Sequence, residues 1–199
     1  MFELTEYIGI IAFSMSGFFV AVRNHLDLLG VLIATFLTAL GGGIVRDIAV
    51  DRVPFTFSHN YPALMVITVL VLLILFKFHR KNSLENKTFF ILSDSIGLVS
   101  FSISGALIGL ENEYNLTGVM TMAFITAVGG GIARDVIINE VPFVFKTGFY
   151  GVVSLLVGVV LYALNVVGLI SLLSISLLFT GALALRLLAY YQKWSLPLR

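Results

Sequence analysis

The chain has 199 residues, 59% of them hydrophobic, and a formal net charge of +1. Its mean hydropathy of +1.05 lies far outside the range of soluble globular proteins and leaves no room for a soluble catalytic domain. The small net charge gives no indication of a nucleic-acid partner, and the lack of cysteine excludes disulfides, thiol catalysis and cysteine–metal sites.

The hydropathy pattern predicts an all-α integral membrane protein with seven transmembrane helices. About 20 apolar residues are needed for a helix to cross a bilayer, and short polar breaks separate runs of that length. The longest connection is the basic stretch 79–87. In chain order the predicted spans cover residues 5–23, 28–50, 61–79, 89–110, 116–138, 147–164 and 167–189.

One segment occurs twice, with no insertion between the copies. Residues 36–57 read FLTALGGGIVRDIAVDRVPFTF, and residues 124–145 read FITAVGGGIARDVIINEVPFVF. Each copy belongs to a set of three spans, an odd number, so the second set must enter the membrane upside down. We therefore predict a first three-helix repeat at 1–87, a second, inverted three-helix repeat at 88–164, and a seventh helix with the C-terminal tail at 165–199. The seventh helix is interpreted as a packing helix.

The loop charges predict the orientation of the protein. By the positive-inside rule, the side with more lysine and arginine is cytoplasmic, which places the N-terminus outside and the C-terminus inside. The other side carries Arg52 among acidic residues at positions 3, 6, 51, 111 and 113. The basic side carries Arg23, Lys77, Arg80, Lys81, Lys87, Lys146, Lys193 and Arg199.

Glycine triplets lie inside the second and fifth spans. Three glycines in a helix interior cost about 3 kcal/mol relative to alanine. Packing motifs usually space their glycines along one helix face, whereas three in a row cover most of a turn. We predict that these helices are kinked or locally unwound beside a cavity, with close helix packing as the alternative. The residues are Gly41, Gly42 and Gly43, and Gly129, Gly130 and Gly131.

An arginine–aspartate pair follows each triplet, Arg46–Asp47 in the first copy and Arg134–Asp135 in the second. A charge at the centre of a membrane helix costs about 2.5–3.5 kcal/mol on insertion scales. Apolar residues continue after both pairs, so we interpret the four residues as lining or gating a conduit. The alternative is that they lie near the surface, where arginine snorkels to water.

Other polar residues recur at matching positions. Glu6 and Asp94 correspond to each other and are interpreted as interfacial. Thr38 and Thr126 precede the triplets and either bond helix carbonyls or face the path. The serines of spans one and four form either a hydroxyl-lined wall or a tight packing surface, and they are Ser14, Ser16, Ser102 and Ser104. The repeated V-P-F segments at 53–55 and 141–143 are interpreted as structural re-entry turns.

The doubled G-G-G-[IV]-x-R-D pattern, the three-plus-three spans and the seventh helix resemble the prokaryotic branch of the trimeric intracellular cation (TRIC) channel family. Some members of that branch are described as glycine transporters. The resemblance implies a homotrimer in a prokaryotic inner or plasma membrane, in contact with lipid, with a potassium-permeable pore in each protomer between the two triplet-broken helices. Animal members carry Lys-Glu-Val after the first triplet; here residues 44–47 read IVRD, so their phosphoinositide regulation is not implied.

The resulting prediction is a passive channel for monovalent cations, with modest preference for potassium. The alternative is a secondary transporter for a small solute such as glycine, because inverted repeats with broken helices suit both. A non-conducting scaffold would explain neither the triplets nor the charged pairs. No catalytic motif is visible in the sequence, so no enzyme, cofactor or metal site is expected beyond the permeant potassium.

Overall fold

Helices make up nearly all of the chain, as predicted. The computed structural model describes residues 2–80, 83–147 and 149–195, and no strand occurs within these ranges. Short helices α3 (Phe55–Ser58) and α7 (Phe143–Lys146) precede α4 and α8, and a 3-10 turn, η1 (Phe78–Arg80), follows α4. The longer helices, each overlapping one predicted span, are α1 (Phe2–Arg23), α2 (Leu28–Ala49), α4 (Tyr61–Leu75), α5 (Ser83–Glu111), α6 (Leu116–Ile137), α8 (Tyr150–Val166) and α9 (Leu172–Tyr191).

Five of these helices are long and apolar enough to cross a membrane: α1, α2, α5, α6 and α9. The apolar helices α4 and α8 have only 15 and 17 residues. At about 1.5 Å per residue they are shorter than the hydrocarbon core of a bilayer, which is about 30 Å thick. The protein is therefore an integral membrane protein, and seven complete crossings remain a prediction.

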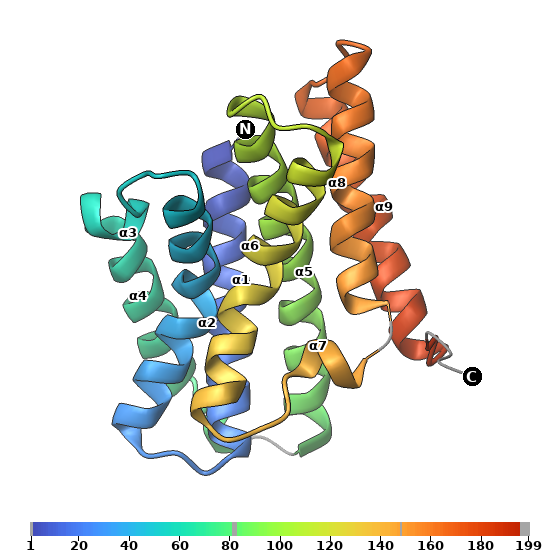
Figure 1. Ribbon diagram of the computed structural model, residues 1–199. Helices are drawn as coiled ribbons and strands as arrows, with labels where there is room; N and C mark the ends of the chain where they lie inside the picture. The colour runs from blue at the N-terminus through green and yellow to red at the C-terminus, as the bar shows by residue number, and fades with distance from the viewer. Residues whose placement is uncertain (1, 81–82, 148, 196–199) are drawn as a thin grey trace.

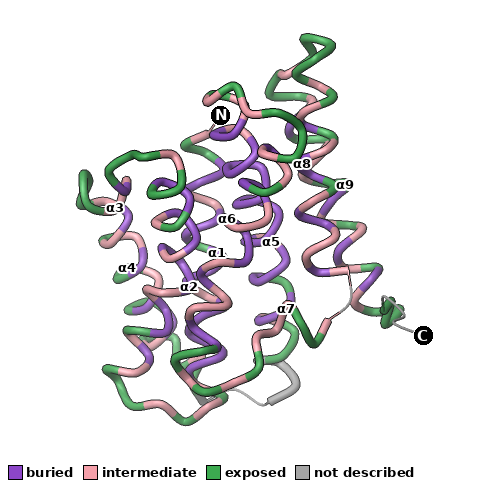
Figure 2. Tube along the Cα trace, in the orientation of Figure 1, coloured by how far each residue is buried: buried purple, intermediate pink, exposed green. Residues whose placement is uncertain are grey.

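Helices that correspond in the two sequence copies run in opposite directions. Figure 1 shows α1 descending from the end marked N while α5 ascends, and α2 ascending while α6 descends. The central helices α1, α2, α5 and α6 pack on one another; α4 lies against α1 and α2, and α8 lies against α5 and α6. Buried residues concentrate along α1 and α5, whereas α9 packs on α5 and α8 and leaves much of its surface exposed (Figure 2).

The centre of the bundle is a reciprocal contact between α1 and α5. A Cβ on Gly9 would lie 3.2 Å from the ring of Phe101, and one on Gly97 would overlap the ring of Phe13. The two rings contact each other with centroids 5.3 Å apart. Each helix thus supplies a glycine that makes room for the phenylalanine of the other.

Matching polar residues begin α2 and α6. The side chain of Asp27 accepts a hydrogen bond from the backbone N–H of Gly30 at 2.8 Å, and that of Asn115 accepts one from Gly118 at 2.9 Å. Such caps satisfy backbone donors that a helix N-terminus leaves free. The sequence therefore defines both starting points in the same way.

The glycine triplets mark the crossing of α2 and α6, and both helices continue through them without interruption. A Cβ on Gly42 would overlap the carbonyl oxygen of Thr126, and one on Gly130 would overlap that of Thr38. The predicted unwinding is therefore wrong, and the alternative of close packing describes the contact. An unwound segment would leave peptide groups unsatisfied at membrane depth, whereas glycine lets two intact helices touch. A bend at the triplets remains a prediction.

The predicted basic loops lie together at one end of the bundle. Figure 1 shows the α1–α2 connection, η1, α7 and the C-terminal end of α9 at the end opposite to that marked N. Of the basic residues used for the orientation, Lys81 and Arg199 lie outside the described residues. Which end faces the cytoplasm remains a prediction.

Candidate functional site

A buried cluster surrounds Arg46 near the C-terminal end of α2. Its Nε donates to Asp47 at 2.8 Å, and its Nη1 donates at 2.6 Å both to Glu6 of α1 and to Ser104 of α5. The hydroxyl of Ser104 also donates to Glu6, at 2.5 Å. The guanidinium is 0% exposed and lies 5.0 Å from the ring centroid of Phe2. We call Arg46, Asp47, Glu6 and Ser104 the Arg46 cluster.

A second buried cluster surrounds Arg134 near the C-terminal end of α6. Its Nε and Nη2 both lie 2.8 Å from Oδ1 of Asp135. Its Nη1 makes longer contacts, at 3.5 Å with Ser16 of α1 and 3.4 Å with Thr38 of α2. Ser16 in turn donates to Asp94 of α5 at 3.0 Å. We call these five residues the Arg134 cluster.

The interfacial interpretation of Glu6 and Asp94 is wrong. Each is only 3% exposed. Sequence position alone puts both near a helix end, but each carboxylate accepts a hydrogen bond from a buried polar group, Arg46 for Glu6 and Ser16 for Asp94. Because a buried charge must be paired and hydrogen-bonded to be tolerated, these residues belong to the clusters. The signal that could have identified them is their matching position in the two copies.

The aspartates also hold the re-entry turns. The backbone N–H of Phe55 donates to Oδ2 of Asp47 at 2.9 Å, and that of Phe143 donates to Oδ2 of Asp135 at 2.7 Å. In each case the preceding proline caps the short helix that follows. The turn interpretation therefore agrees with the structure, which in addition ties each turn to a buried arginine.

The predicted pore-lining hydroxyls divide into two groups. Ser14 and Ser102 donate only to carbonyls of their own helices, at 2.6 and 2.7 Å, and Thr126 does the same at 2.7 Å. Thr38 donates to its own helix at 2.6 Å and also accepts from Arg134. Only Ser16, Ser104 and Thr38 therefore reach the charged groups, although all of these hydroxyl side chains are buried.

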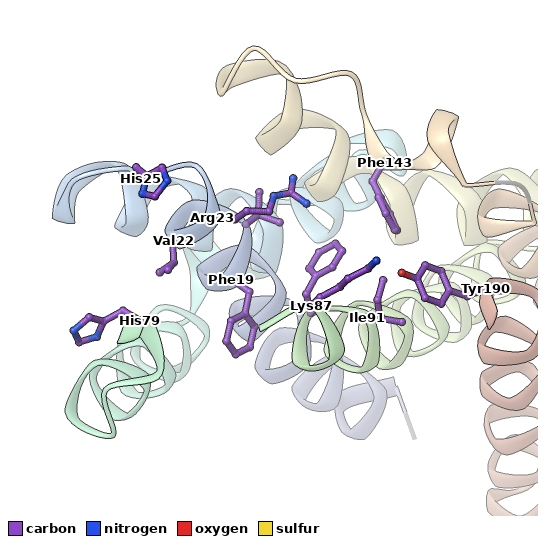
Figure 3. A pocket seen from close by; sticks show the side chains of 11 residues that line it. Phe19, Val22, Arg23, His25, His79, Lys87, Ile91, Phe143 and Tyr190 are labelled. Carbon is purple, nitrogen blue, oxygen red and sulfur yellow. The ribbon is translucent and has the colours of Figure 1, made fainter. Parts of the chain in front are cut away.

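A cavity reaches the Arg134 cluster from the basic end. About 150 Å³ in volume, it is bordered by Arg134 and Asp135 and also by Glu140 and Lys146. The hydrogen bond from Lys146 lowers the pKa of Glu140, which lies in the connection after α6. Several residues that line this 150 Å³ cavity also line a larger cavity of about 600 Å³. In the larger cavity, Lys87 and Tyr190 point toward each other (Figure 3). The shared walls are Val20, Arg23, Phe90 and Phe143.

One charged residue was missed by the sequence interpretation. Arg186 of α9 is completely buried, although the seventh helix was expected only to pack. Its guanidinium carbon lies 4.7 Å from the ring centroid of Tyr150. Apolar residues on both sides of it in the sequence were the available signal. Within residues 2–80, 83–147 and 149–195, no cluster of three or more His, Cys, Asp or Glu side chains is suited to a metal ion.

The chain is similar in sequence and in fold to known membrane proteins. The family model described as "Glycine transporter" matches residues 3–79 and 91–166. The UPF0126 membrane protein YvgT of Bacillus subtilis is 35% identical over 197 residues, which cover 99% of this chain and 96% of that protein. A prokaryotic TRIC channel solved in 0.5 M KCl superposes with a TM-score of 0.89 at 29% identity, covering 98% of each chain. The TRIC trimeric intracellular cation channel orthologue from Rhodobacter sphaeroides gives a TM-score of 0.88 at 27% identity, covering 97% of this chain and 98% of that one.

Proposed function

The chain belongs to the family that the glycine transporter model describes and has the fold of the prokaryotic TRIC channels, and on this premise we propose that it is a passive channel for monovalent cations, with potassium preferred over sodium. The observation that carries the proposal is the pair of buried arginine clusters. They lie toward opposite ends of the crossing helices α2 and α6, and a cavity leads from the basic end to one of them.

The sequence predicted a pore between the two triplet-bearing helices; we place the permeation path next to their crossing rather than through the contact itself. At the crossing the backbones of α2 and α6 are in contact, since a Cβ on Gly41 would lie only 3.1 Å from the Cα of Gly130. The path therefore follows the polar groups that α1 and α5 add on either side. Ser16 and Ser104 are the hydroxyls that link these helices to Arg134 and Arg46.

The charge of the clusters favours cations. Each contains one guanidinium and two carboxylates, so the carboxylates outnumber the positive charge in both. Rings of carboxylates select cations in known pores, and a weakly coordinating path without a carbonyl filter gives modest selectivity. The arginines hold the carboxylates in place and keep the path from binding a cation too tightly to release it.

The proposed architecture is an inverted repeat of seven spans with kinked second and fifth spans. It is supported by the opposite directions of α1 and α5 and by contacts that recur in both copies, such as the turn bonds to Asp47 and Asp135. In this proposal, units 1–87 and 88–164 are the repeats and 165–199 is the appended helix. The basic end is cytoplasmic by the positive-inside rule.

A homotrimer with one pore in each protomer completes the proposal. Its support is the likeness to the Rhodobacter sphaeroides protein, which is described as trimeric. The mass of the protein–detergent complex, measured with correction for bound detergent, gives the number of chains. A monomer or dimer as the only species would contradict this part of the proposal.

Single-channel recording tests the function directly. The purified protein is placed in a planar bilayer with KCl on one side and NaCl on the other, and we expect discrete steps whose reversal potential favours potassium. The likeness to solved channels favours this outcome over carrier transport. A silent bilayer, combined with saturable uptake of labelled glycine by liposomes from the same preparation, would assign the protein as a transporter instead.

A further inference from the structure

Arg186 is a buried cation whose surroundings are mainly aromatic. Its side chain is 0% exposed, and among the described residues none accepts a hydrogen bond from its Nε, Nη1 or Nη2. Three aromatic rings surround it instead, with centroids 4.7 Å away for Tyr150, 5.7 Å for Tyr190 and 6.0 Å for Phe143. Ring faces attract a guanidinium, but far less than burial disfavours its charge. A buried guanidinium in such a cage requires a nearby negative charge.

Asp94 is the carboxylate that matches this requirement. It lies on α5, against which α9 packs, and it interacts electrostatically with Arg186 and with Tyr150, whose ring also faces the guanidinium. Its Oδ1 accepts from Ser16 at 3.0 Å, while among the described residues its Oδ2 has no partner in full hydrogen-bond geometry and interacts more weakly with the Tyr150 side chain. Arg186 and Asp94 are therefore buried groups of opposite charge on two helices that pack together, and each has polar atoms without a hydrogen-bond partner among the described residues.

The length of the Asp94 side chain explains why its carboxylate does not bind an arginine directly. At the matching position, Glu6 is one methylene longer and reaches Arg46 directly at 2.6 Å. The shorter Asp94 side chain accepts from Ser16 at 3.0 Å and interacts with Tyr150, while Arg134 reaches the same serine from the other side at 3.5 Å. The two clusters therefore have the same charges but differ in how the second carboxylate is neutralised.

We propose that Arg186 is the counter-charge of Asp94 and, through it, a positioning residue that makes the polar path electrically asymmetric. The Arg134 cluster together with Arg186 has two positive and two negative groups, whereas the Arg46 cluster has one positive and two negative groups. This proposal rests on the proposed channel function. A permeant cation is then held more strongly at the Arg46 cluster, and the current depends on the direction of the voltage.

A thermal-stability cycle tests the pairing without any current. Variants Arg186→Met, Asp94→Asn and the double variant are compared in detergent, because residues that interact give non-additive effects. We expect the double variant to lose less melting temperature than the sum of the two single losses. Additive losses would overturn the pairing. Thr180→Ala, an exposed position on the same helix, serves as the matched control and should melt as the wild type does.

A second pair of variants separates electrical from structural effects. In Arg186→Met with Asp94→Glu, the longer carboxylate should reach Arg134 as Glu6 reaches Arg46, which restores the melting temperature lost in Arg186→Met. Its current–voltage curve should nevertheless become nearly symmetric, with a several-fold change in the ratio of inward to outward current. Arg186→Lys keeps the charge and should keep the wild-type asymmetry. If the double variant Arg186→Met, Asp94→Glu rectifies as the wild type and Arg186→Lys do, Arg186 has only a structural role and the proposal is wrong.

The two sets of measurements also separate this proposal from the channel proposal. A wild-type protein without current contradicts the channel, while the stability cycle still decides whether Arg186 and Asp94 are a pair. A conducting wild type with an additive cycle contradicts the pair and leaves the channel standing.

Discussion

Arg46 donates a hydrogen bond to Glu6 at 2.6 Å, which joins the last turns of α2 to the start of α1 across 40 positions of sequence. Both side chains are almost completely buried. Removing one partner of such a pair leaves an uncompensated charge in a medium of low polarity, at a cost of about 3–5 kcal/mol. The pair therefore fixes the relative position of the two helices as well as their charge.

The helix crossing predicts that alanine substitutions at two triplet glycines have different effects on stability. Gly42→Ala places a methyl group on the carbonyl of Thr126, whereas Gly131→Ala meets only the far end of the Arg134 side chain at 3.8 Å. We expect Gly42→Ala to lower stability by about 1–3 kcal/mol because backbone cannot move aside easily. Gly131→Ala should be neutral or stabilising, since alanine favours helix. Equal melting temperatures in detergent would contradict the contact.

The serines of α5 provide a second matched comparison. Ser104 connects Arg46 to Glu6, whereas Ser102 bonds only to a carbonyl of its own helix. Ser104→Ala should cost about 1–3 kcal/mol, because it removes a hydrogen bond from two buried charged groups. Ser102→Ala should cost clearly less. A reversed order in thermal unfolding would show that Ser104 is not a member of the cluster.

Asp135 should contribute strongly to the stability of the fold, because it is the carboxylate paired with the buried Arg134. Asp135→Asn removes the negative charge beside Arg134 while keeping an acceptor for the N–H of Phe143. The unpaired guanidinium should then destabilise the fold by about 3–5 kcal/mol. The control is Asp51→Asn, at an exposed position with φ of 54° that suits asparagine. Similar melting temperatures for the two variants would be inconsistent with a buried ion pair.

Arg134→Gln should change conduction and not only expression. The substitution removes the positive charge at the end of the cavity that opens toward the basic end, so the single-channel conductance or the ion selectivity should change several-fold. Lys193→Gln, an exposed residue after α9, should conduct as the wild type does. Folding is checked by the elution profile of each variant. An unchanged current in a folded Arg134→Gln protein would place this arginine outside the path.

The connection after α6 should make a small pH-dependent contribution to stability. The hydrogen bond from Lys146 lowers the pKa of Glu140 below its ordinary value of 4.5. A lowered pKa means that the stabilisation is present above the unfolded pKa and is lost as the pH falls through the lower, folded value. Carbon-13 NMR of the Glu140 carboxyl group should show this pKa and its return toward 4.5 in Lys146→Met. An identical titration in both proteins would exclude the bond in solution.

Much of the fold could be predicted because it depends on local sequence. Apolar runs defined the long helices, and the repeated segment identified Arg46 and Arg134 as a matched pair before any contact was known. The behaviour of the triplets could not be predicted, since a glycine that permits unwinding also permits close approach, and the choice depends on the facing helix. Here the carbonyl of Thr126 lies where the side chain of Gly42 would be.

The burial of Glu6, Asp94 and Arg186 was also beyond the sequence interpretation. Each lies within a few turns of a helix end, where charged side chains commonly reach water. Their burial depends on neighbours that are far away in the chain, such as Ser104 for Glu6 and Tyr150 for Arg186. Matching positions in a duplicated sequence can indicate such residues, but Arg186 lies outside the duplication and has no counterpart.

The packing of Gly9 against Phe101, and of Gly97 against Phe13, limits which substitutions the protein can accept. A larger residue at Gly97 requires a smaller one at Phe13, and the two rings rest on each other, so a change at any of the four sites alters the room available to the rest. This junction therefore restricts substitution at the four positions more than packing restricts the exposed surfaces of α1 and α5. Among homologues these four positions should covary as a single unit, so that a lineage tolerates a substitution at one site only when a compensating substitution has occurred at another.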